Sequence, residues 1–367
     1  MIVRDEADSI QRCIESVAPY ITRWAIVDTG SVDATEIVAK KALGNLPGKW
    51  KSVMWSGDFS LHRNQSLDLA RSIAASCDSY ILLIDADEVL VVKSIEAFLL
   101  CLRQDRVVTW WAEDADWRFR KLGLIRIADA IEWRGTVHEH LVVSAECEAA
   151  SQVSQDAAHL IYGHNGFRRR NATITTAADL RWLARAVLGR NPADDYRASF
   201  YLARTHEVSL DFGIAAVHFR AAATQAQFDD DKWQALWGLG RVLLQQESLA
   251  EAAAAFTAAT AVAPARAETL IGLSNIALRL KQFPEALTLA YEALSKPQPN
   301  ETSMYDKSAY GWRAVDTLSM SAFALGNCEA LRDAVLRYGD LLRQGRVPQR
   351  EIARIEQNIV CIKSALG

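Results

Sequence analysis

The sequence predicts two domains of different class, an α/β domain followed by an all-α helical-repeat domain. Short apolar runs typical of strands alternate with helical patterns in the first part of the chain. Beyond Arg168 the strand signals stop, and the remainder is rich in alanine and leucine and carries an internal repeat. A chain of 367 residues is also longer than one ordinary domain. We therefore predict an α/β domain over residues 1–170 and a repeat domain over residues 171–367.

The composition is that of a globular protein. Hydrophobic residues make up 50% and charged residues 23% of the chain, which argues against disordered, fibrous and membrane classes. The apolar run Leu249–Ala265 is mostly alanine and threonine and contains Glu251, so no transmembrane segment is predicted. A net charge of −4 provides no broad cationic surface for nucleic acid. The basic cluster Arg168–Arg170 is interpreted as a solvated helix start.

The six cysteines are scattered, without a C-x-x-C pair or zinc-finger spacing, so most are expected to be reduced thiols. Charged residues from Arg4 onward interrupt any apolar leader segment, which argues against secretion and favours a cytoplasmic location. The predicted first strand has only Met1–Val3 ahead of its loop, which is compatible with a truncated start.

The elements of the α/β domain follow from the spacing of apolar residues. Apolar residues at helical spacing over Ile10–Val17 predict a helix, and the compact run Trp24–Val27 predicts a strand that ends at Asp28. Asp33 and Glu36 resemble a capping box ahead of the next helix. The later strands are predicted at Ser52–Trp55, Tyr80–Ile84, Val107–Trp111, Leu122–Ile127 and Val137–Val143, and the later helices at Leu61–Ala75 and Ser94–Leu102.

The second domain repeats a pattern of small and apolar residues with the period of about 34 residues that is typical of tetratricopeptide repeats. The clearest copy runs from Leu236 to Pro264, the next covers Leu270–Ala293, and a weaker copy covers Leu202–Ala222. Residues Ala309–Leu342 are either a degenerate fourth copy or a cap. The small residues let paired helices approach closely, so we predict a helical solenoid.

The acidic run Asp85-Ala86-Asp87-Glu88 follows the predicted buried strand Tyr80–Ile84. Such a run lies at the carboxyl edge of a parallel sheet, where ligands usually bind. Neighbouring carboxylates repel each other, and Mg²⁺ or Mn²⁺ shared with a bound diphosphate would relieve this repulsion. A polar loop with helix-capping acids is the alternative, and an Asp-x-Asp pattern alone does not decide between them.

Several ordered blocks accompany this run. They are Met1–Glu6, Val27–Thr35, Asp58–Ser60 with Arg63-Asn64, Leu83–Glu88, Trp133–Glu139 and His164–Gly166. Together they resemble glycosyltransferase family 2, specifically its bacterial branch with C-terminal tetratricopeptide repeats. The resemblance implies that the first domain has the GT-A fold, a Rossmann-like α/β fold of nucleotide-diphospho-sugar transferases.

The resemblance also implies a set of residues that contact the nucleotide sugar. These are Ile2, Val3, Arg4, Asp28, Thr29, Arg63, Asp85, Ala86 and Asp87. An acid at a strand end can accept a hydrogen bond from a base or ribose, and a guanidinium can pair with phosphate. A capping role for Asp28 and a surface salt bridge for Arg63 are the alternatives.

Metal and catalytic roles follow from the same resemblance. Asp87 would coordinate Mn²⁺ or Mg²⁺ directly, Asp85 would contact the ribose or a metal-bound water, and His164 would be a third protein ligand. An inverting enzyme needs a general base, for which Glu139 is the first candidate and Asp114 the second. The alternatives are solvated acids and a histidine satisfied within a loop.

The predicted function is that of a metal-dependent, inverting glycosyltransferase. Its donor would be a nucleoside-diphosphate sugar, in the first place a UDP-sugar, and its acceptor a peptide, protein or glycan docked on the repeats. The alternative is a non-catalytic tetratricopeptide scaffold with a vestigial sugar-nucleotide site. A nucleotidyltransferase is disfavoured, because the start of the chain has no glycine-rich phosphate loop with lysine or arginine.

Overall fold

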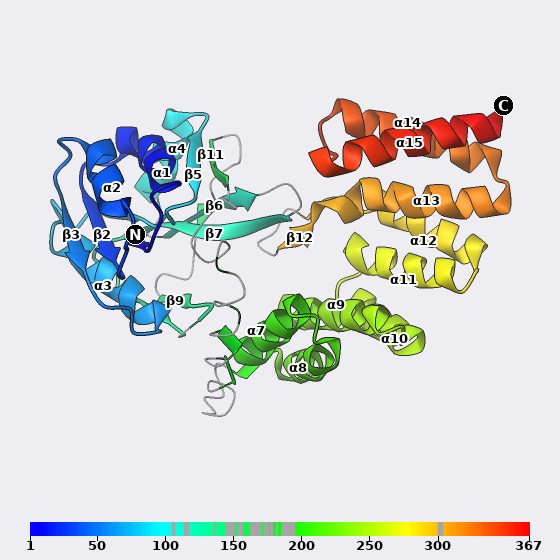
Figure 1. Ribbon diagram of the computed structural model, residues 1–367, viewed down its shortest axis with the longest axis horizontal. Coiled ribbons are helices and arrows are strands. Elements are labelled where there is room, and N and C mark those ends of the chain that lie inside the picture. Colours follow the sequence, from blue (N-terminus) through cyan, green and yellow to red (C-terminus); the bar gives the residue numbers. More distant parts are fainter. Residues whose placement is uncertain are drawn as a thin grey trace. The chain divides into compact units, whose positions relative to one another are not determined.

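The chain divides into two units, each with its own hydrophobic core (Figure 1). The computed structural model describes residues 1–104, 107–113, 117–135, 137–143, 151–152, 157–161, 171, 176, 179–180, 183–184, 195–299 and 304–367. The α/β unit contains Met1–Asp114 and Arg118–Trp182. The repeat unit contains Ala115–Trp117 and Leu183–Gly367.

The first sheet of the α/β unit is parallel, with strand order β1-β2-β3. Strand β1 (Ile2–Val3) pairs with the end of β2 (Trp24–Asp28), and β3 (Gly48–Ser52) pairs along the whole of β2. The strand predicted at Ser52–Trp55 is therefore wrong in position. The ladder with β2 places Gly48 opposite Trp24, and a Cβ at Gly48 would lie only 2.3 Å from the Trp24 ring.

The helices of the α/β unit cover its sheets. Those with described bounds are α1 (Ile10–Val17), the 3₁₀ turn η1 (Ala18–Tyr20), α2 (Thr35–Leu43), α3 (Phe59–Arg71) and α4 (Ile95–Gln104). The prediction for α1 is confirmed, since its apolar stripe is buried. Helix α3 begins earlier than predicted, because the Asp58 side chain accepts the Leu61 N–H and caps the first turn.

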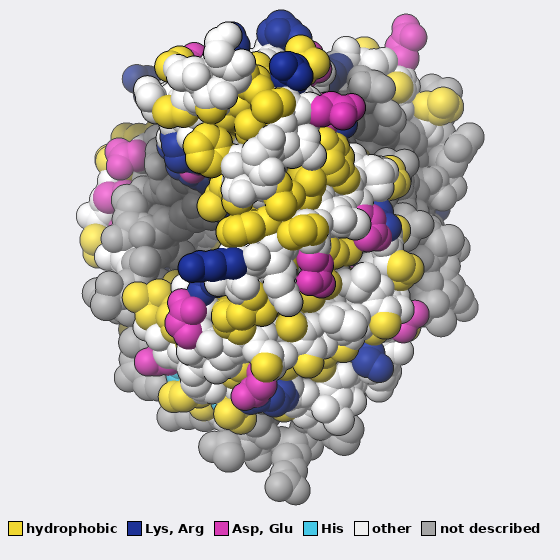
Figure 2. All heavy atoms as spheres, turned by 90° about the vertical axis from the view of Figure 1, so that its right-hand side faces the viewer, with side chains coloured by type: hydrophobic (Ala, Val, Ile, Leu, Met, Phe, Trp, Pro, Cys, Tyr) yellow, Lys and Arg dark blue, Asp and Glu magenta, His cyan; other side chains and the backbone are white. Residues whose placement is uncertain are grey.

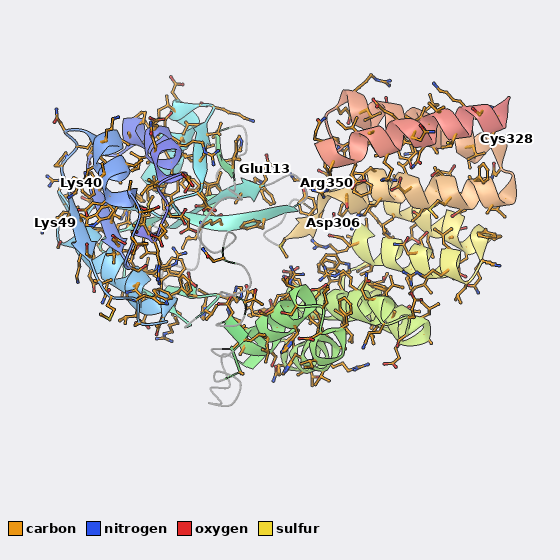
Figure 3. All side chains as sticks on the ribbon, viewed as in Figure 1. Lys40, Lys49, Glu113, Asp306, Cys328 and Arg350 are labelled. Carbon is orange, nitrogen blue, oxygen red and sulfur yellow. The ribbon has the colours of Figure 1, made fainter. Side chains whose placement is uncertain are left out.

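The capping box predicted at Asp33 and Glu36 does not form. The N-cap of α2 is Ala34, which makes no side-chain capping bond. Asp33 instead accepts from the backbone N–H groups of Thr35 at 2.9 Å and Ala7 at 3.1 Å. Glu36 forms an ion pair with Lys40 one turn along the helix (Figure 3). The Asp33 side chain therefore links the loop after β1 to the start of α2, and it does not form a capping box with Glu36.

A second sheet completes the α/β unit, with strand order β7-β6-β11-β5; β10 pairs with β6, and β4 pairs with β7. Its strands are β4 (Tyr80–Leu82), β5 (Val89–Val92), β6 (Val107–Glu113), β7 (Trp117–Arg126), β10 (Ser151–Gln152) and β11 (Ala158–Ile161). A separate hairpin consists of β8 (Ile131–Arg134) and β9 (His140–Val143). The strand predicted at Tyr80–Ile84 is shorter than expected, and β4 is half-buried rather than buried.

The repeat unit is built from antiparallel helix pairs. Its helices are α7 (Asp195–Val208), α8 (Phe212–Gln225), α9 (Asp229–Gln245), α10 (Leu249–Val262), α11 (Ala267–Arg279), α12 (Phe283–Ser295), α13 (Trp312–Leu325), α14 (Cys328–Arg343) and α15 (Gln349–Leu366). Between α12 and α13 lie β12 (Tyr305–Asp306) and the 3₁₀ turn η3 (Lys307–Tyr310), which Asp306 caps (Figure 3). The predicted helical solenoid is confirmed, and the predicted copies coincide with the successive pairs from α7 to α12.

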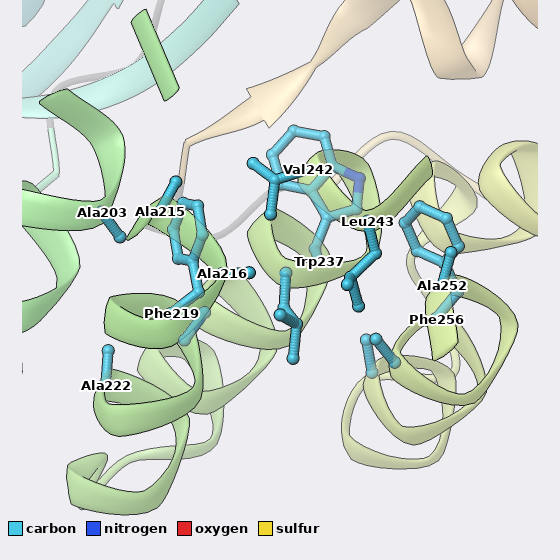
Figure 4. Packing of buried hydrophobic residues seen from close by; sticks show 14 of the residues in the cluster. Ala203, Ala215, Ala216, Phe219, Ala222, Trp237, Val242, Leu243, Ala252 and Phe256 are labelled. Carbon is cyan, nitrogen blue, oxygen red and sulfur yellow. The ribbon is translucent and has the colours of Figure 1, made fainter. Parts of the chain in front are cut away.

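Phenylalanine rings pack against glycines both within a helix pair and where neighbouring pairs meet. Phe219 and Phe256 are buried in the core that Figure 4 shows. A Cβ on Gly238 would lie 2.5 Å from the Phe219 ring, and one on Gly240 would lie 2.5 Å from the Phe256 ring. Gly272 of α11 approaches the same Phe256 ring from the next pair. These glycines let the helices approach as the repeat pattern predicts.

Hydrophobic side chains also gather on the surface of the repeat unit. Figure 2 shows them in the middle of one face, with charged side chains around them. The large apolar residues that are exposed include Met320 and Phe323 of α13, Leu336 of α14 and Val360 of α15. Exposed apolar groups of this size are typical of surfaces that contact other proteins.

Candidate functional site

The loop after β2 is organised by Asp28, which lies at the carboxyl end of the parallel sheet. One Asp28 oxygen accepts from the N–H groups of Gly30 at 3.1 Å and Ser31 at 2.9 Å and from the Ser31 hydroxyl at 2.8 Å. Thr29 donates through its N–H and its hydroxyl to the Val3 carbonyl. Asp28 and Thr29 are buried, so both side chains hold the loop in place.

The loop after β1 is tied to the same region. Asp5 has a positive φ of 51° and accepts from the N–H groups of Val32 and Asp33. The Ser31 hydroxyl in turn accepts from the Asp5 N–H at 3.0 Å. The predicted nucleotide contacts Ile2, Val3 and Arg4 therefore lead into a loop that is hydrogen-bonded to the Asp28 loop. The sheet geometry brings these predicted residues to one edge.

A cluster of five charged side chains, which we call the charge cluster, lies beside this edge. It consists of Arg63, Asp85, Glu88, Lys121 and Glu139. Arg63 of α3 donates to Asp85 at 3.0 Å and also to Glu139. Lys121 of β7 donates to the second Asp85 oxygen at 2.8 Å and to Glu88 at 2.5 Å. Both oxygens of Asp85 are thus bound by cations.

Further contacts fix this arrangement. The Asp85 N–H donates to Glu88 at 2.8 Å, and the Cys13 thiol donates to the Asp85 carbonyl. Asn64 exchanges hydrogen bonds with the backbone of Trp133, whose ring lies 4.9 Å from the Arg63 guanidinium. The aromatic face and the two carboxylates together hold Arg63 in one orientation.

The charges shift one another's titration. Burial opposes ionisation of Asp85, but Arg63 and Lys121 outweigh it and hold the pKa of that carboxyl far below its usual range. Burial raises the pKa of Glu88, and the pull of Lys121 opposes this shift only in part. Asp85 is therefore held in its ionised form, while burial makes ionisation of Glu88 less favourable than in water.

The cluster has consequences for the predicted metal site. A divalent cation at Asp85 would have to displace Arg63 and Lys121 or approach two positive charges. Ala86 is buried, and Asp87 is half-buried on the same turn. Among the described residues, no group of three or more His, Cys, Asp or Glu side chains is placed to hold a metal ion. The predicted residues Asp114 and His164 lie outside the described residues.

The structure unites some predicted site residues and adds others. Arg63, Asp85 and Glu139 were predicted separately and meet in the charge cluster. Lys121 and the role of Glu88 were not predicted. The pairing of β6 with β7 places Lys121 opposite Trp110, and this register cannot be read from the sequence of β7 alone.

A second set of charged residues lies in the repeat unit. Glu207 of α7 binds the Arg241 guanidinium of α9 through both oxygens, with contacts of 2.8 Å. It also accepts from Arg204 at 3.3 Å. The Arg241 guanidinium lies 4.1 Å from the Trp237 ring, and burial lowers its pKa to about 10. One glutamate therefore serves two arginines. The charge of Asp306 also acts on Arg241, but Asp306 is itself paired with Arg313, so three arginines stand beside two acids.

A similar contact between an arginine, a tryptophan and a glutamate lies at the start of α11. The Arg266 guanidinium lies 3.7 Å from the buried Trp233 ring and 3.4 Å from Glu268. Tyr310 donates to Glu268 at 2.7 Å, and burial raises the pKa of this glutamate. Arginine and tryptophan thus meet repeatedly along the first helices of the pairs. These helices also contact one another in succession, α7 with α9, α9 with α11 and α11 with α13.

Helix pairs with this spacing make the C-terminal half of the chain a tetratricopeptide-like helical solenoid. The chain is similar to a TPR repeat-containing protein of Synechococcus elongatus, with 39% identity over 94 residues. This match covers 26% of the chain and 21% of the relative, so the chain spans about a fifth of that protein's length. No family model matches the chain.

Solved repeat structures are also similar to the chain. BtubC from P. vanneervenii has 14% identity and a TM-score of 0.41, covering 53% of this chain and 83% of its own. TTC0263, a thermophilic TPR protein of Thermus thermophilus, has 17% identity and a TM-score of 0.35, covering 54% and 94%. YrrB, described as a TPR protein with an unusual peptide-binding site, has 15% identity and a TM-score of 0.29, covering 50% and 92%.

The prediction that the chain is a glycosyltransferase enzyme is wrong. The curated relative is described as a repeat protein rather than as a transferase. The charge cluster supplies a physical reason, because both oxygens of Asp85, the first acid of the predicted Asp-x-Asp site, are already neutralised by Arg63 and Lys121. None of the helices that the structure describes has the length and hydropathy needed to cross a membrane.

Proposed function

We propose that the chain is a non-catalytic scaffold whose repeat unit binds an extended acidic segment of a partner protein. The binding surface would be the row of first helices α7, α9, α11 and α13, since solenoids of helix pairs present such rows on their concave side. The observation that carries the proposal is Glu207, which is shared by Arg204 and Arg241. The excess positive charge at this point suits a carboxylate of the partner.

The aromatic rings support the same partner chemistry. Trp237 lies under Arg241 and is buried, so the guanidinium is held by its ring and by Glu207 before any partner arrives. A donor fixed in this way loses little conformational entropy when it binds a carboxylate. The exposed apolar side chains of α13 and α14 would add contact area for a partner.

The test uses a fluorescein-labelled peptide of alternating glutamate and glycine and a matched lysine and glycine peptide. Fluorescence anisotropy should show binding of the acidic peptide that weakens with salt, and no binding of the basic one. Arg204→Gln should weaken binding by about tenfold, because a charge-assisted hydrogen bond contributes about 1.5–3 kcal/mol.

Arg220→Gln is the matched control, since Arg220 lies on α8 and is half-exposed in an ion pair with Glu251. It should leave the affinity unchanged. Equal affinity for the two peptides, or equal effects of the two substitutions, would reject the acidic partner.

We also propose that the α/β unit has the GT-A fold and retains a vestigial sugar-nucleotide site. The parallel sheet β1-β2-β3, the buried Asp28 and Thr29 and the nearby Arg63 support this proposal. Mn²⁺ or Mg²⁺ would bind through Asp87, which leaves the cation pairs of Asp85 intact. Stabilisation by a UDP-sugar should then require Mn²⁺ and disappear in Asp87→Asn, without turnover of the donor. Identical melting curves with UDP-, GDP- and dTDP-sugars would rule this site out.

A further inference from the structure

The helices α7, α9, α11 and α13 of the repeat unit end in the same way. One residue with a positive φ follows each helix, so the chain turns at an equivalent place in each pair. These residues are Leu210, Glu247, Lys281 and Gly326, with φ between 59° and 63°. Positions counted back from these turns are therefore equivalent, and their side chains can be compared from one helix to the next.

The position six residues before each turn lies on the open side of its helix. It is occupied by Arg204, Arg241, Asn275 and Met320. The residues directly before and after this position are buried in all four helices. The position itself is half-buried in α7, α9 and α11 and exposed in α13. We call these four side chains the accessible row, since a partner that crosses the helices can reach one of them on each.

The chemistry of the accessible row changes along the unit. Arg204 and Arg241 are cations that share Glu207. Asn275 carries an amide that can both donate and accept, and among the described residues nothing pairs with it. Met320 is apolar and 59% exposed. A partner that follows the row from α7 would therefore meet positive charge first and an apolar surface last.

Phe323 enlarges the apolar end of the accessible row. It lies one turn beyond Met320 on α13 and is 61% exposed. Side chains three residues apart on a helix lie next to each other, so the two form one apolar pair. The equivalent of Phe323 in α7 is the acid Glu207. The charge of Asp316, about one turn before Met320, is compensated by Arg354 at 2.8 Å.

We propose that the acidic segment of the partner also carries an apolar residue, which packs against Met320 and Phe323 while the acid pairs with Arg204 and Arg241. This inference rests on the proposed function, because it requires that the segment runs along the first helices of the pairs. The acid would give the two arginines a second carboxylate besides Glu207. A purely acidic segment would leave the apolar pair in water and gain nothing at α13.

The spacing of the two partner groups follows from helix packing. Two helix steps, α9 to α11 and α11 to α13, separate Arg241 from Met320. Packed helices lie about 8–10 Å apart and an extended chain rises about 3.3 Å per residue, so the acid and the apolar residue should be about five or six positions apart. The backbone between them would pass the amide of Asn275. A spacer of only two residues would be too short to reach both ends.

The test uses three fluorescein-labelled peptides and fluorescence anisotropy. One carries a pair of glutamates in a glycine and serine chain, and the other two add a Leu-Phe pair either five or two residues away from the glutamates. Each is made in both chain directions, and the direction that binds more tightly is compared. The long-spacer peptide should bind at least about tenfold more tightly than the purely acidic one, because its apolar side chains leave water. The short-spacer peptide should bind like the purely acidic one.

Met320→Ser should remove this gain and leave the affinity for the purely acidic peptide unchanged. Val360→Ser is the matched control, since Val360 is 56% exposed on α15, outside the accessible row. It should leave all three affinities unchanged. An equal gain with both spacers, or an undiminished gain in Met320→Ser, would overturn this inference while the acidic partner stands. Failure of all three peptides to bind would reject the proposed function, and this inference with it.

Discussion

At the scale of single residues, the negative charge of Asp85 is already compensated by two cations. Arg63 and Lys121 each bind one of its oxygens, and Lys121 also binds Glu88, whose side chain is fully buried. Each cation therefore compensates more than one carboxylate. Removing a single cation leaves buried negative charge without a partner, which costs more than the pair itself contributes.

Lys121→Met should destabilise the α/β unit by about 3 kcal/mol, because Glu88 loses its cationic partner and Asp85 loses one of its two. Urea unfolding followed by circular dichroism measures this change. Lys40→Met is the matched control, since the pair of Lys40 with Glu36 is half-exposed. The control should change stability by no more than about 0.5 kcal/mol. Equal effects of the two substitutions would contradict the role assigned to the charge cluster.

Glu88 predicts how stability depends on pH. Burial raises its pKa above the unfolded value of about 4.3, so the folded state binds the proton more tightly than the unfolded state. The stability that this adds is complete below that unfolded value and is lost as the pH rises through the folded pKa. Asp85, with a lowered pKa, acts in the opposite sense and loses its contribution only in more acidic solution.

Between pH 5 and pH 8, Glu88→Gln should therefore show a smaller fall in stability than the original chain. Urea midpoints measured at both pH values for the two proteins provide the comparison. The substitution keeps a side-chain acceptor for the Asp85 N–H. An unchanged difference between the two pH values would show that Glu88 titrates alike in the folded and unfolded states.

The sequence predicted the acids of this site better than their partners. Asp85 and Glu139 follow strands or loops that sequence patterns can locate. Lys121 enters through the antiparallel register of β6 with β7, which includes an irregularity between Val108 and Thr109. A register of this kind depends on tertiary pairing, so the ion pair between Lys121 and Asp85 could not be predicted from the sequence.

At the scale of elements, packing decided where sequence periodicity was ambiguous. Helix α1 was predicted correctly, because its apolar stripe has an unambiguous helical period. Strand β3 has two exposed lysines on either side of one half-buried tryptophan, Trp50. Its position is fixed by its pairing with β2. Such a strand lacks the apolar run on which the prediction depended.

Gly240→Ala should destabilise the repeat unit by about 1–3 kcal/mol, because the added Cβ would meet the Phe256 ring at 2.5 Å. Thermal unfolding of the full chain measures the loss. Gly213→Ala, also in a helix, is the control: its Cβ would meet only the end of the Gln246 side chain, at 3.6 Å. It should be neutral or stabilising by up to about 1 kcal/mol. A loss as large as that of Gly240→Ala would contradict the assignment of that loss to the contact with the Phe256 ring.

At the scale of the whole molecule, each unit has separate hydrophobic clusters. Trp110 belongs to a cluster of the α/β unit, whereas Phe219 and Tyr338 belong to clusters of the repeat unit. Since each unit buries its own apolar side chains, calorimetry of the full chain should resolve more than one unfolding transition. Lys121→Met should shift one transition and Gly240→Ala another. A single transition that both substitutions shift equally would contradict independent units.

The function class is where sequence reasoning failed. Repeats are visible in a sequence because small residues recur with a fixed period, and the solenoid was predicted for that reason. An Asp-x-Asp run is visible too, but its charge state depends on Arg63 and Lys121, which come from other elements. The same letters can therefore hold a metal in one fold environment and an arginine in another.

The position of Cys13 makes the protein suitable for a thiol-labelling experiment. This residue is fully buried in α1, and burial raises the pKa of its thiol, so an alkylating reagent cannot react with it in the folded state. Cys77 and Cys328 are exposed and would react at once; Cys328 is labelled in Figure 3. Delayed modification of Cys13, resolved by mass spectrometry, would report the rate at which the α/β unit opens, with a cysteine that the chain already contains.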